Sequence, residues 1–351
     1  MTTPSAVEAL PYEPSQLGEL LGAGWEELLR SGYRWMLLGR ALDARMQGLQ
    51  RQGRVGFYGA ATGHEAVNVA AGLASARDDW VFPGLREQLV ALVRGHPLAT
   101  YVHHLFADSK DPARGRNMPC HPSASEVHYV SMSSVIGTQV THAVGVAYAQ
   151  KMRSERAATL AFFGDGATSS NDFHAGLNFA GVFQLPVVFC CANNQWAISM
   201  PVAHQTATST LASKAKSYGL SGITVDGTDF VASYAALARA LRLAREGGGP
   251  SMVEFVVYRM VPHSSSDDPG RYQPPDWSER AAQHDPVERL RSLLGVQGLV
   301  TEELGARWRS EAENEVRAAV EDAESTPPPS PDSVTEDVYA SHSYLPARSG
   351  G

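Results

Sequence analysis

The order of apolar and polar residues predicts alternating strands and helices over most of this chain. Thr159 to Phe163 and Val187 to Cys191 are short apolar runs, a pattern typical of strands buried on both faces of a sheet. Residues 171–182, between these runs, carry apolar side chains at helical spacing, and Gln184-Leu185-Pro186 ends that helix. A strand, a helix and a second strand in this order predict two parallel strands of one sheet.

The same alternation continues towards both ends of the chain. We expect further strands near residue 80, at 222–227 and at 252–258, and helices at 25–52, 63–76, 139–152, 230–246, 285–294 and 301–323, with one more before residue 105. Polar stretches at 108–134 and 264–276 are typical of binding loops. The pattern predicts an α/β fold with a doubly wound parallel sheet flanked by helices. We expect a flexible arm at 1–20, one α/β domain with helical extensions at 21–325, and a proline-rich linker and tail at 326–351.

Composition limits the classes of function. The 351 residues are 43% hydrophobic and 19% charged, which is the balance of a globular protein. A net charge of −8 disfavours binding to nucleic acid or to an acidic membrane. No apolar run is long enough to span a bilayer, and the first residues lack the pattern of a signal or transit peptide. Cys190 and Cys191 fall in an expected buried strand, so with Cys120 they indicate no disulfide framework, and we expect a cytoplasmic location.

Two polar motifs follow the two central strands. Gly164-Asp165-Gly166 comes directly after the first strand, and Asn193-Asn194 comes directly after the second. Because open α/β sheets bind ligands beyond the carboxyl ends of their strands, we expect Asp165 and Asn194 to meet at one sheet edge. Carboxylate and amide oxygens suit a hard cation such as Mg²⁺, which completes its shell with water and substrate phosphates. The alternative is that each motif is an ordinary turn.

The spacing of these motifs resembles the thiamine diphosphate binding motif. A wider set of segments is similar to the alpha subunit of the decarboxylating component of 2-oxo acid dehydrogenase complexes, and in particular to the branched-chain type. The likeness covers roughly residues 30–340. Its segments are Arg51-Gln52-Gly53-Arg54, Phe57-Tyr58, Gly115-Arg116-Asn117-Met118-Pro119 with His121, His174-Ala175-Gly176-Leu177-Asn178-Phe179-Ala180, Asn193-Asn194-Gln195-Trp196-Ala197-Ile198-Ser199, Tyr258-Arg259 with His263-Ser264-Ser265-Ser266-Asp267-Asp268, and Asp337-Val338-Tyr339.

The resemblance implies that Mg²⁺ and thiamine diphosphate bind at this sheet edge. Asp165 and Asn194 would supply side-chain oxygens to the metal, and Trp196 would supply its backbone carbonyl. The cofactor-binding residues would also include Gly164, Gly166 and Ala167.

Two arginines are candidates for contacts with the cofactor. Arg86 matches a phosphate-binding arginine of the family, and a guanidinium fork fits phosphate oxygens. Leu85 stands where the family often has an aromatic residue, which removes one expected hydroxyl contact. A surface helix arginine is the alternative for Arg86. Arg259 is the second candidate, for which an ion pair at a strand end is the alternative.

The segment Ser134-Val135-Ile136 matches the part of the family that contacts the aminopyrimidine ring. Ile136 would wedge between the two rings and hold the cofactor bent, so that the aminopyrimidine acts as an intramolecular base by proximity. Core packing is the alternative for Ile136. Ser133, Thr138 and Gln139 match positions that hold potassium in the branched-chain type, which makes a potassium ion a further hypothesis.

Two histidines match active-site histidines of the family. His263 follows a strand and opens a polar loop, where it would transfer a proton or stabilise an intermediate. His128 matches the second, and an idle, exposed loop histidine is the alternative for a residue of this kind. His64 and His121 are also polar candidates, for which a local structural hydrogen bond is the default.

Substrate and regulation rest on three further residues. Phe57 and Tyr58 are expected to line the acyl pocket, with aromatic core packing as the alternative. Ser264 stands where a kinase modifies the eukaryotic branched-chain enzymes, and a polar loop that is merely rich in serine is the alternative.

The resemblance implies an enzyme that decarboxylates a branched-chain 2-oxo acid oxidatively and acylates a lipoyl group. The family needs a second polypeptide, a beta subunit, to activate the aminopyrimidine, so we expect an α2β2 assembly that serves the lipoyl domain of an acyltransferase component. The alternatives are an alpha subunit for pyruvate or acetoin, or a catalytically idle thiamine diphosphate-binding paralogue. A nucleotide-binding oxidoreductase is disfavoured, because residues 164–169 lack the third glycine of that turn.

Overall fold

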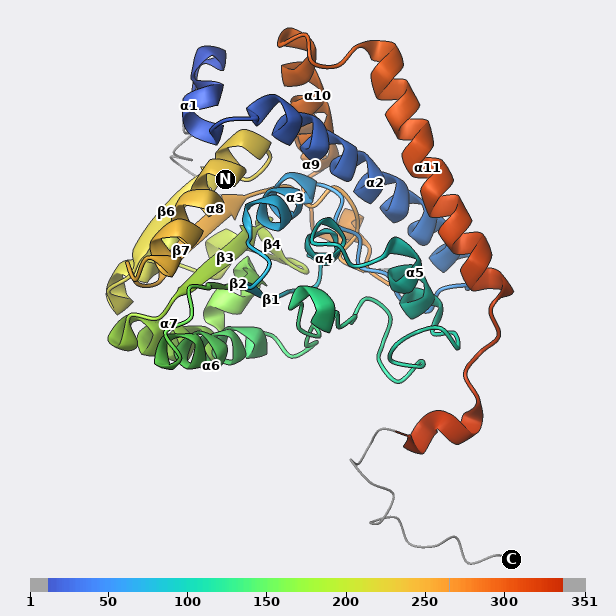
Figure 1. Cartoon of the computed structure of the whole chain (residues 1–351), viewed down its shortest axis with the longest axis horizontal. Helices are drawn as coiled ribbons and strands as arrows, with labels where there is room; N and C mark the ends of the chain where they lie inside the picture. The colour runs from blue at the N-terminus through green and yellow to red at the C-terminus, as the bar shows by residue number, and fades with distance from the viewer. Residues whose placement is uncertain (1–11, 265, 337–351) are drawn as a thin grey trace, which may run out of the picture.

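The computed structural model describes residues 12–264 and 266–336 (Figure 1). The first eleven residues of the expected arm, Ser265 of the polar loop, and the tail segment Asp337-Val338-Tyr339 lie outside the described residues.

A five-stranded, fully parallel sheet forms the centre of the molecule. Its order is β1-β2-β3-β7-β6, and the bounds are Trp80–Phe82 for β1, Thr159–Gly164 for β2, Val187–Asn193 for β3, Ser251–Val256 for β7 and Ser221–Asp226 for β6. Thr159 pairs with Val187, and Gly164 pairs with Ala192. The predicted pair of parallel strands is therefore confirmed, and both strands end at the same edge of the sheet.

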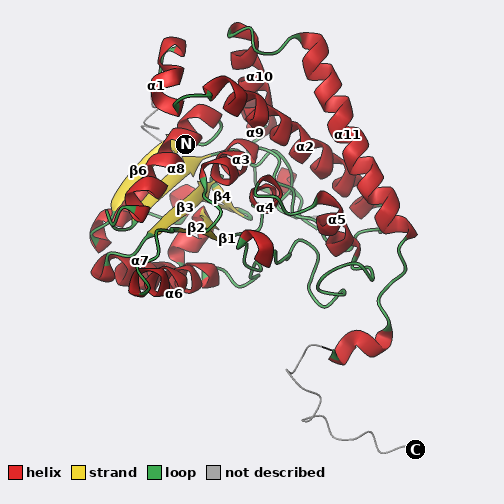
Figure 2. Cartoon of the chain, in the orientation of Figure 1, coloured by secondary structure: helices red, strands yellow, loops and turns green. Residues whose placement is uncertain are grey.

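Helices cover both faces of this sheet, as the predicted doubly wound fold requires (Figure 2). Along β2, Leu160 and Phe162 enter one core, while Ala161 and Phe163 enter the other. The first core lies under α3 (Glu65–Ala74) and α8 (Phe230–Arg245), and the second lies under α6 (Thr138–Met152) and α7 (Asn171–Phe183). Cys190 and Cys191 are buried and free, as expected for core residues.

A helical layer surrounds the first core. The long helix α2 (Trp25–Arg51) is packed against α11 (Glu302–Ser325), and α11 also contacts α5 (Leu98–Phe106) (Figure 1). Further helices are α4 (Gln88–Val93), α9 (Trp277–Gln283) and α10 (Pro286–Val296). A two-stranded hairpin of β4 (Trp196–Ala197) and β5 (Met200–Pro201) follows β3. Within the described ranges, every helix is too short or too polar to cross a lipid bilayer.

Two expectations about the fold need correction. The described part of the expected arm includes α1 (Leu17–Leu21), which contacts α8 and buries Leu17 completely, so residues 17–20 are part of the domain. The Tyr12 hydroxyl also donates to Asp229 Oδ2 at 3.1 Å. Residues 80–105 form two helices instead of one, because Gly95 at φ 108° and Pro97 interrupt the helical run.

Candidate active site

A cavity of about 440 Å³ lies beyond the carboxyl ends of β2 and β3, and we call it the sheet-edge cavity. It brings together segments that are more than 200 residues apart in sequence. The predicted site residues that line it are Phe57, Arg86, Ser133, Ser134, Ile136, Gly164, Asp165, Gly166, Ala167, Gln139, Asn194, Trp196 and His263. Four of the predicted residues do not line it, namely Tyr58, His128, Thr138 and Arg259.

Asp165 supplies a buried carboxylate to this cavity. Asp165 comes directly after β2 in the sequence. Its Oδ2 atom accepts a hydrogen bond of 2.6 Å from Gln205 Nε2. Gln205 is itself fixed, since it also donates to the Met200 carbonyl at 3.0 Å. Burial raises the pKa of Asp165 to about 6. The neighbouring hydrogen bonds and charges therefore do not offset the cost of burying the ionised Asp165 carboxylate. A bound cation would stabilise it.

Asn194 and Trp196 lie beside Asp165 at the end of β3. The Trp196 backbone N–H donates to Asn194 Oδ1 at 3.2 Å, which closes a turn and fixes the amide oxygen at the cavity wall. Among the described residues, no three His, Cys, Asp or Glu side chains converge on one point. A cation at this edge would thus be held by one carboxylate together with amide, carbonyl and ligand oxygens, a set that fits Mg²⁺ and a phosphorylated ligand.

Gly166 allows the hairpin after β3 to approach the Asp165 turn. A Cβ atom placed on Gly166 would lie 2.7 Å from the Cβ of Ala197, closer than two carbon atoms pack. Any larger residue would push the β4–β5 hairpin, and with it Asn194 and Trp196, away from Asp165. The requirement for glycine here is steric, since the residue does not need a left-handed backbone.

Arg259 has a different place from the one predicted. It is almost completely buried, and it donates to the carbonyls of Trp196 at 3.4 Å and Ile198 at 3.1 Å and to the Tyr272 hydroxyl at 2.7 Å. A weak ion pair of 3.9 Å joins it to Asp267. The alternative of an ion pair at a strand end therefore describes Arg259 better than cofactor binding does. Arg259 donates hydrogen bonds to the loop after β3 and does not line the cavity.

Arg86 and His263, which also line the cavity, form a contact. Arg86 Nη2 donates to the His263 carbonyl at 2.7 Å and lies 3.4 Å from its ring Nδ1, while Nη1 donates to the carbonyl of Ala60. Burial, followed by the charges of Arg86 and Arg259, lowers the pKa of His263 to about 4. Burial also lowers the pKa of Arg86, to about 10. At neutral pH the imidazole is uncharged and the guanidinium is charged.

His128 does not reach the cavity, which corrects the prediction of a second catalytic histidine there. Its ring stacks on Trp80 with centroids 4.9 Å apart, and its carbonyl accepts from the Val81 N–H. Trp80 begins β1, whereas the cavity lies beyond the other end of that strand. The backbone of the 108–134 loop pairs with β1 at Val81. This pairing places His128 at the start of β1, away from the cavity at the end of that strand.

Phe57 and Tyr58 are adjacent but face opposite ways. Phe57 lines the cavity, as predicted for the acyl pocket. Tyr58 is buried instead, and its hydroxyl donates to Asp43 Oδ1 at 2.7 Å. The core-packing alternative therefore holds for Tyr58, because neighbouring residues of an extended segment point to opposite sides.

The predicted aminopyrimidine and potassium segments lie together before α6. Ile136 is 64% exposed and lines the cavity, so it is not a core residue. Ser133 Oγ accepts from the Val135 N–H at 3.2 Å, and Gln139 Nε2 donates to the Phe162 carbonyl at 2.9 Å. Gln139 Oε1 is buried and has no partner among the described residues. Thr138 begins α6 but is not in the cavity wall.

Several groups in the cavity wall, or next to it, were missed or given little weight by sequence reasoning. His64 is buried, and both of its ring nitrogens lack a partner within the described ranges. His121 lines the cavity and contacts Ser134. Burial raises the pKa of Glu87, beside Arg86, to about 7. Gln205 supports Asp165 from outside any predicted motif. Of these groups, only His64 and His121 were candidates from the sequence, and for both a local structural hydrogen bond was the default.

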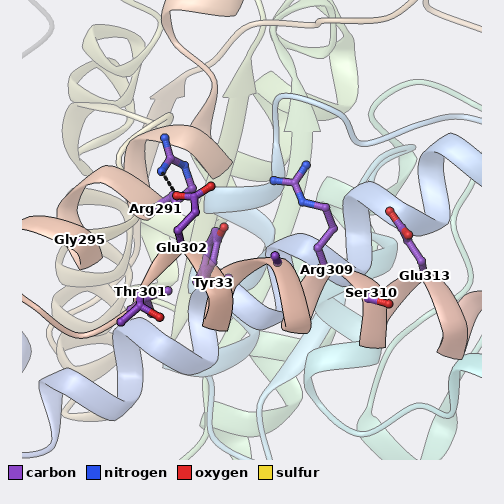
Figure 3. Close-up of a pocket in the computed structure, with 11 residues that line it drawn as sticks. Tyr33, Arg291, Gly295, Thr301, Glu302, Arg309, Ser310 and Glu313 are labelled. Atoms are coloured by element: carbon purple, nitrogen blue, oxygen red, sulfur yellow. Dashed lines mark ion pairs between the residues drawn. The ribbon is translucent and has the colours of Figure 1, made fainter.

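A second cavity, of about 490 Å³, lies far from these strand ends between α2, α10 and α11, and we call it the helical cavity (Figure 3). Arg291 forms ion pairs with Glu302 at 3.5 Å and with Glu288 at 2.7 Å. Arg309 is 3.8 Å from Glu288. Figure 3 shows the side chains of Arg291, Glu302 and Arg309 along the helix surfaces around Tyr33. Both arginines are already paired with carboxylates, so the helical cavity offers less to a ligand than its volume suggests.

Comparison with known proteins agrees with the sheet-edge geometry. A family model described as the dehydrogenase E1 component matches residues 33–332. The chain belongs to the dehydrogenase E1 component family. This family uses thiamine diphosphate, and membership confirms the predicted oxidoreductase class and excludes the nucleotide-binding alternative.

Three similar proteins are alpha subunits. The 3-methyl-2-oxobutanoate dehydrogenase subunit alpha of Mycobacterium tuberculosis is 43% identical over 322 residues, which cover 90% of this chain and 83% of the relative. The 2-oxoisovalerate dehydrogenase subunit alpha of Bacillus subtilis is 38% identical, covering 88% of this chain and 94% of the relative. The mitochondrial 2-oxoisovalerate dehydrogenase subunit alpha of Homo sapiens is 37% identical, covering 88% of this chain and 69% of the relative. The predicted likeness to the branched-chain type is confirmed, and the name alpha implies a beta partner.

Proposed function

We propose that this chain is the alpha subunit of a branched-chain 2-oxo acid dehydrogenase, and that it holds the diphosphate end of thiamine diphosphate in the sheet-edge cavity. The observation that carries the proposal is the position of Asp165 and Asn194 at the ends of two adjacent parallel strands, in a chain whose relatives are alpha subunits of that type. The cofactor, when bound, supplies the nucleophilic carbon and the electron sink. The residues of this chain bind it, orient it and manage protons.

The proposed metal site uses Asp165, Asn194 and the carbonyl of Trp196 to hold Mg²⁺. Its support is the buried carboxylate of Asp165, whose charge is not fully offset and whose Oδ1 makes no side-chain hydrogen bond to a described residue. Arg86 is the proposed partner of the diphosphate. Its charged guanidinium lines the same cavity, although the protein carbonyls of Ala60 and His263 already take two of its donors. A phosphate would compete for those donors or use the remaining ones.

His263 is the proposed proton-handling group. At neutral pH its ring is uncharged, because its pKa is lowered to about 4 by burial and by the two nearby arginines. Arg86 faces the Nδ1 atom, so Nδ1 is the acceptor and Nε2 carries the proton. His263 can therefore donate a hydrogen bond to a substrate oxygen without adding a positive charge beside Arg86.

Ser134 and Ile136 are proposed to contact the aminopyrimidine half of the cofactor, and Phe57 the acyl chain of the substrate. The exposed aliphatic side chain of Ile136 at the cavity supports a wedge role. Gln139 Oε1, which is buried without a partner, supports potassium near Ser133 and Thr138, although Thr138 lies outside the cavity wall. A cytoplasmic location also stays a prediction.

The beta subunit is proposed to cover this face in an α2β2 assembly that serves a lipoyl domain. Exposed apolar side chains gather in two places, around the cavity and on α6 and α7. At the cavity they are Met118, Val135, Ile136 and Ile198, and on the helices they are Tyr148, Met152, Phe179, Val182 and Phe183. Apolar clusters of this kind mark protein contacts. We expect Phe179→Glu to weaken assembly with the beta subunit, and Leu243→Glu, a similarly exposed position on α8, to leave it unchanged; equal assembly of both variants would remove this support.

Reconstitution tests the function itself. The purified chain should show no decarboxylase activity alone, and activity should appear when the beta subunit is added with Mg²⁺ and thiamine diphosphate. Rates with branched-chain 2-oxo acids should exceed those with pyruvate or acetoin. Full activity of the chain alone would contradict the two-subunit site. A complex that binds the cofactor but lacks activity would favour the idle paralogue. An assay with an artificial electron acceptor in place of the lipoyl domain distinguishes an active complex from an idle one.

A further inference from the structure

A histidine–serine pair lies in the wall of the sheet-edge cavity. His121 Nε2 and Ser134 Oγ are 2.7 Å apart, and both residues line the cavity. The His121 ring is buried, whereas Ser134 is exposed at the cavity side. These residues are 13 positions apart in an irregular loop, so their contact is a product of the tertiary fold.

The proton positions within this pair follow from its neighbours. His121 Nδ1 is 3.0 Å from the carbonyl oxygen of Pro119. A carbonyl can only accept, so Nδ1 carries the ring proton, and Nε2 of the neutral ring is an acceptor. The Ser134 hydroxyl must therefore donate its proton to Nε2. With its only proton directed to the imidazole, Ser134 Oγ has only lone pairs to offer to the cavity.

A buried network holds His121 in this orientation. Its backbone N–H donates to His104 Nε2 at 3.1 Å, and His104 Nδ1 donates to Asp111 Oδ1 at 3.1 Å. Burial alone would raise the pKa of Asp111, but hydrogen bonds, first that from His104, lower it, so it is ionised and a good acceptor. Cys120, just before His121, has φ 65°, a left-handed backbone that is costly for a residue with a side chain. The fold thus maintains an unfavourable backbone at the residue that aims this ring.

We propose that His121 is a positioning residue that fixes the Ser134 hydroxyl as a hydrogen-bond acceptor for an amino group of the bound cofactor. The inference rests on the proposed function, which puts an aminopyrimidine beside Ser134. A free serine hydroxyl accepts or donates and so does not distinguish an amino group from an oxygen. A serine whose proton is held by Nε2 prefers the amino group. His121 thereby contributes to cofactor discrimination without touching the cofactor.

The test compares two cofactors on the complex of this chain with its beta subunit. Thiamine diphosphate carries an amino group on the pyrimidine, and oxythiamine diphosphate carries an oxygen there. Dissociation constants are measured with Mg²⁺ by tryptophan fluorescence. We expect Ser134→Ala and His121→Leu each to lower the preference for the amino cofactor by about tenfold, on the order of one hydrogen bond. The double variant should lose no more than either single one, because the two residues act as a unit.

Two further variants separate positioning from a structural role. His121→Gln presents an amide oxygen that can accept the serine proton, so it should retain most of the preference. Ser131→Ala removes a hydroxyl that donates to the His121 carbonyl at 3.3 Å and does not line the cavity, so the preference should not change. Variants that weaken both cofactors equally would overturn the proposal while leaving the proposed function intact. A wild-type complex that binds neither cofactor would overturn both.

Discussion

Two cavities lined by described residues have almost the same volume and very different chemistry. The sheet-edge cavity, of about 440 Å³, contains carboxyl groups whose pKa is raised by burial, at Asp165 and Glu87, and polar atoms of His64 and Gln139 without partners among the described residues. The helical cavity, of about 490 Å³, has arginines on exposed helix surfaces, each already paired with a glutamate.

We therefore expect buried charge without a partner to mark a ligand site better than empty volume does. Burying a charge without a partner costs free energy, so such groups persist where a ligand completes them. Parallel strands explain why the costly groups gather at one place. All five strands end in the same direction, and the turns that follow them supply buried side chains to one edge. Exposed helix surfaces do not bring buried polar side chains together at one place in this way.

Removing the carboxylate of Asp165 should have the largest effect on this contrast. We expect Asp165→Ala to weaken Mg²⁺-dependent thiamine diphosphate binding by about 100-fold or more, because the metal loses its charged protein ligand. Titration calorimetry on the complex with the beta subunit measures the dissociation constant of thiamine diphosphate with and without Mg²⁺. Glu302→Ala, a carboxylate at the helical cavity, is the matched control and should bind normally. Unchanged affinity in Asp165→Ala would refute the metal assignment.

The next largest effect is expected at His263. His263→Ala should lower kcat by about 100-fold, within the range for loss of a general acid or base, while the cofactor dissociation constant changes little. Steady-state kinetics and cofactor titration on the same preparation separate the two. Tyr33→Phe in the helical cavity should leave kcat unchanged. A variant with wild-type turnover would return His263 to the class of idle loop histidines.

The pH dependence of stability should also distinguish the two cavities. Burial raises the pKa of Glu87 from 4.5 to about 7, so the folded state holds a proton that the unfolded state releases. The stability linked to this group is present below pH 4.5 and is lost as the pH rises to about 7. Relative to Glu87→Gln, wild type should lose about 3 kcal/mol of unfolding free energy across this window, at 1.36 kcal/mol for each pKa unit.

Urea denaturation of both proteins at pH 4.5 and pH 8 measures this difference. Glu313→Gln, at the helical cavity, should follow wild type at both values. Parallel profiles for wild type and Glu87→Gln would mean that Glu87 is ionised without cost in the folded chain, and the contrast between the cavities would then rest on Asp165 and His263.

The smallest effect is expected from breaking the ion pairs of the helical cavity. Arg291→Ala should cost only about 0.5 kcal/mol of stability, because exposed pairs gain little over hydration, and the cost should disappear in high salt. Thermal unfolding at low and high ionic strength checks this. A loss of several kcal/mol, or a loss of activity, would show that the helical cavity is more than a surface groove.

Sequence reasoning was reliable where a pattern depends on near neighbours. The strands around Gly164 and Asn193 and the helix between them are where the apolar spacing predicted, since burial on both faces of a sheet demands continuous apolar runs. The convergence of Asp165 and Asn194 followed from the parallel pairing. Leu17 was missed because its burial depends on α8, more than 200 residues later.

The sequence alone determined the fold class, the family resemblance and the edge of the sheet that carries the site, because these follow from local periodicity and from a motif of fixed spacing. Tertiary structure alone decided which side chains of the long loops meet. His121 and His128 are seven residues apart in one loop, yet one lines the cavity beside Ser134 and the other stacks on Trp80 at the far end of β1. Irregular segments have no period from which direction can be read, so only their contacts with the sheet settle where each side chain points.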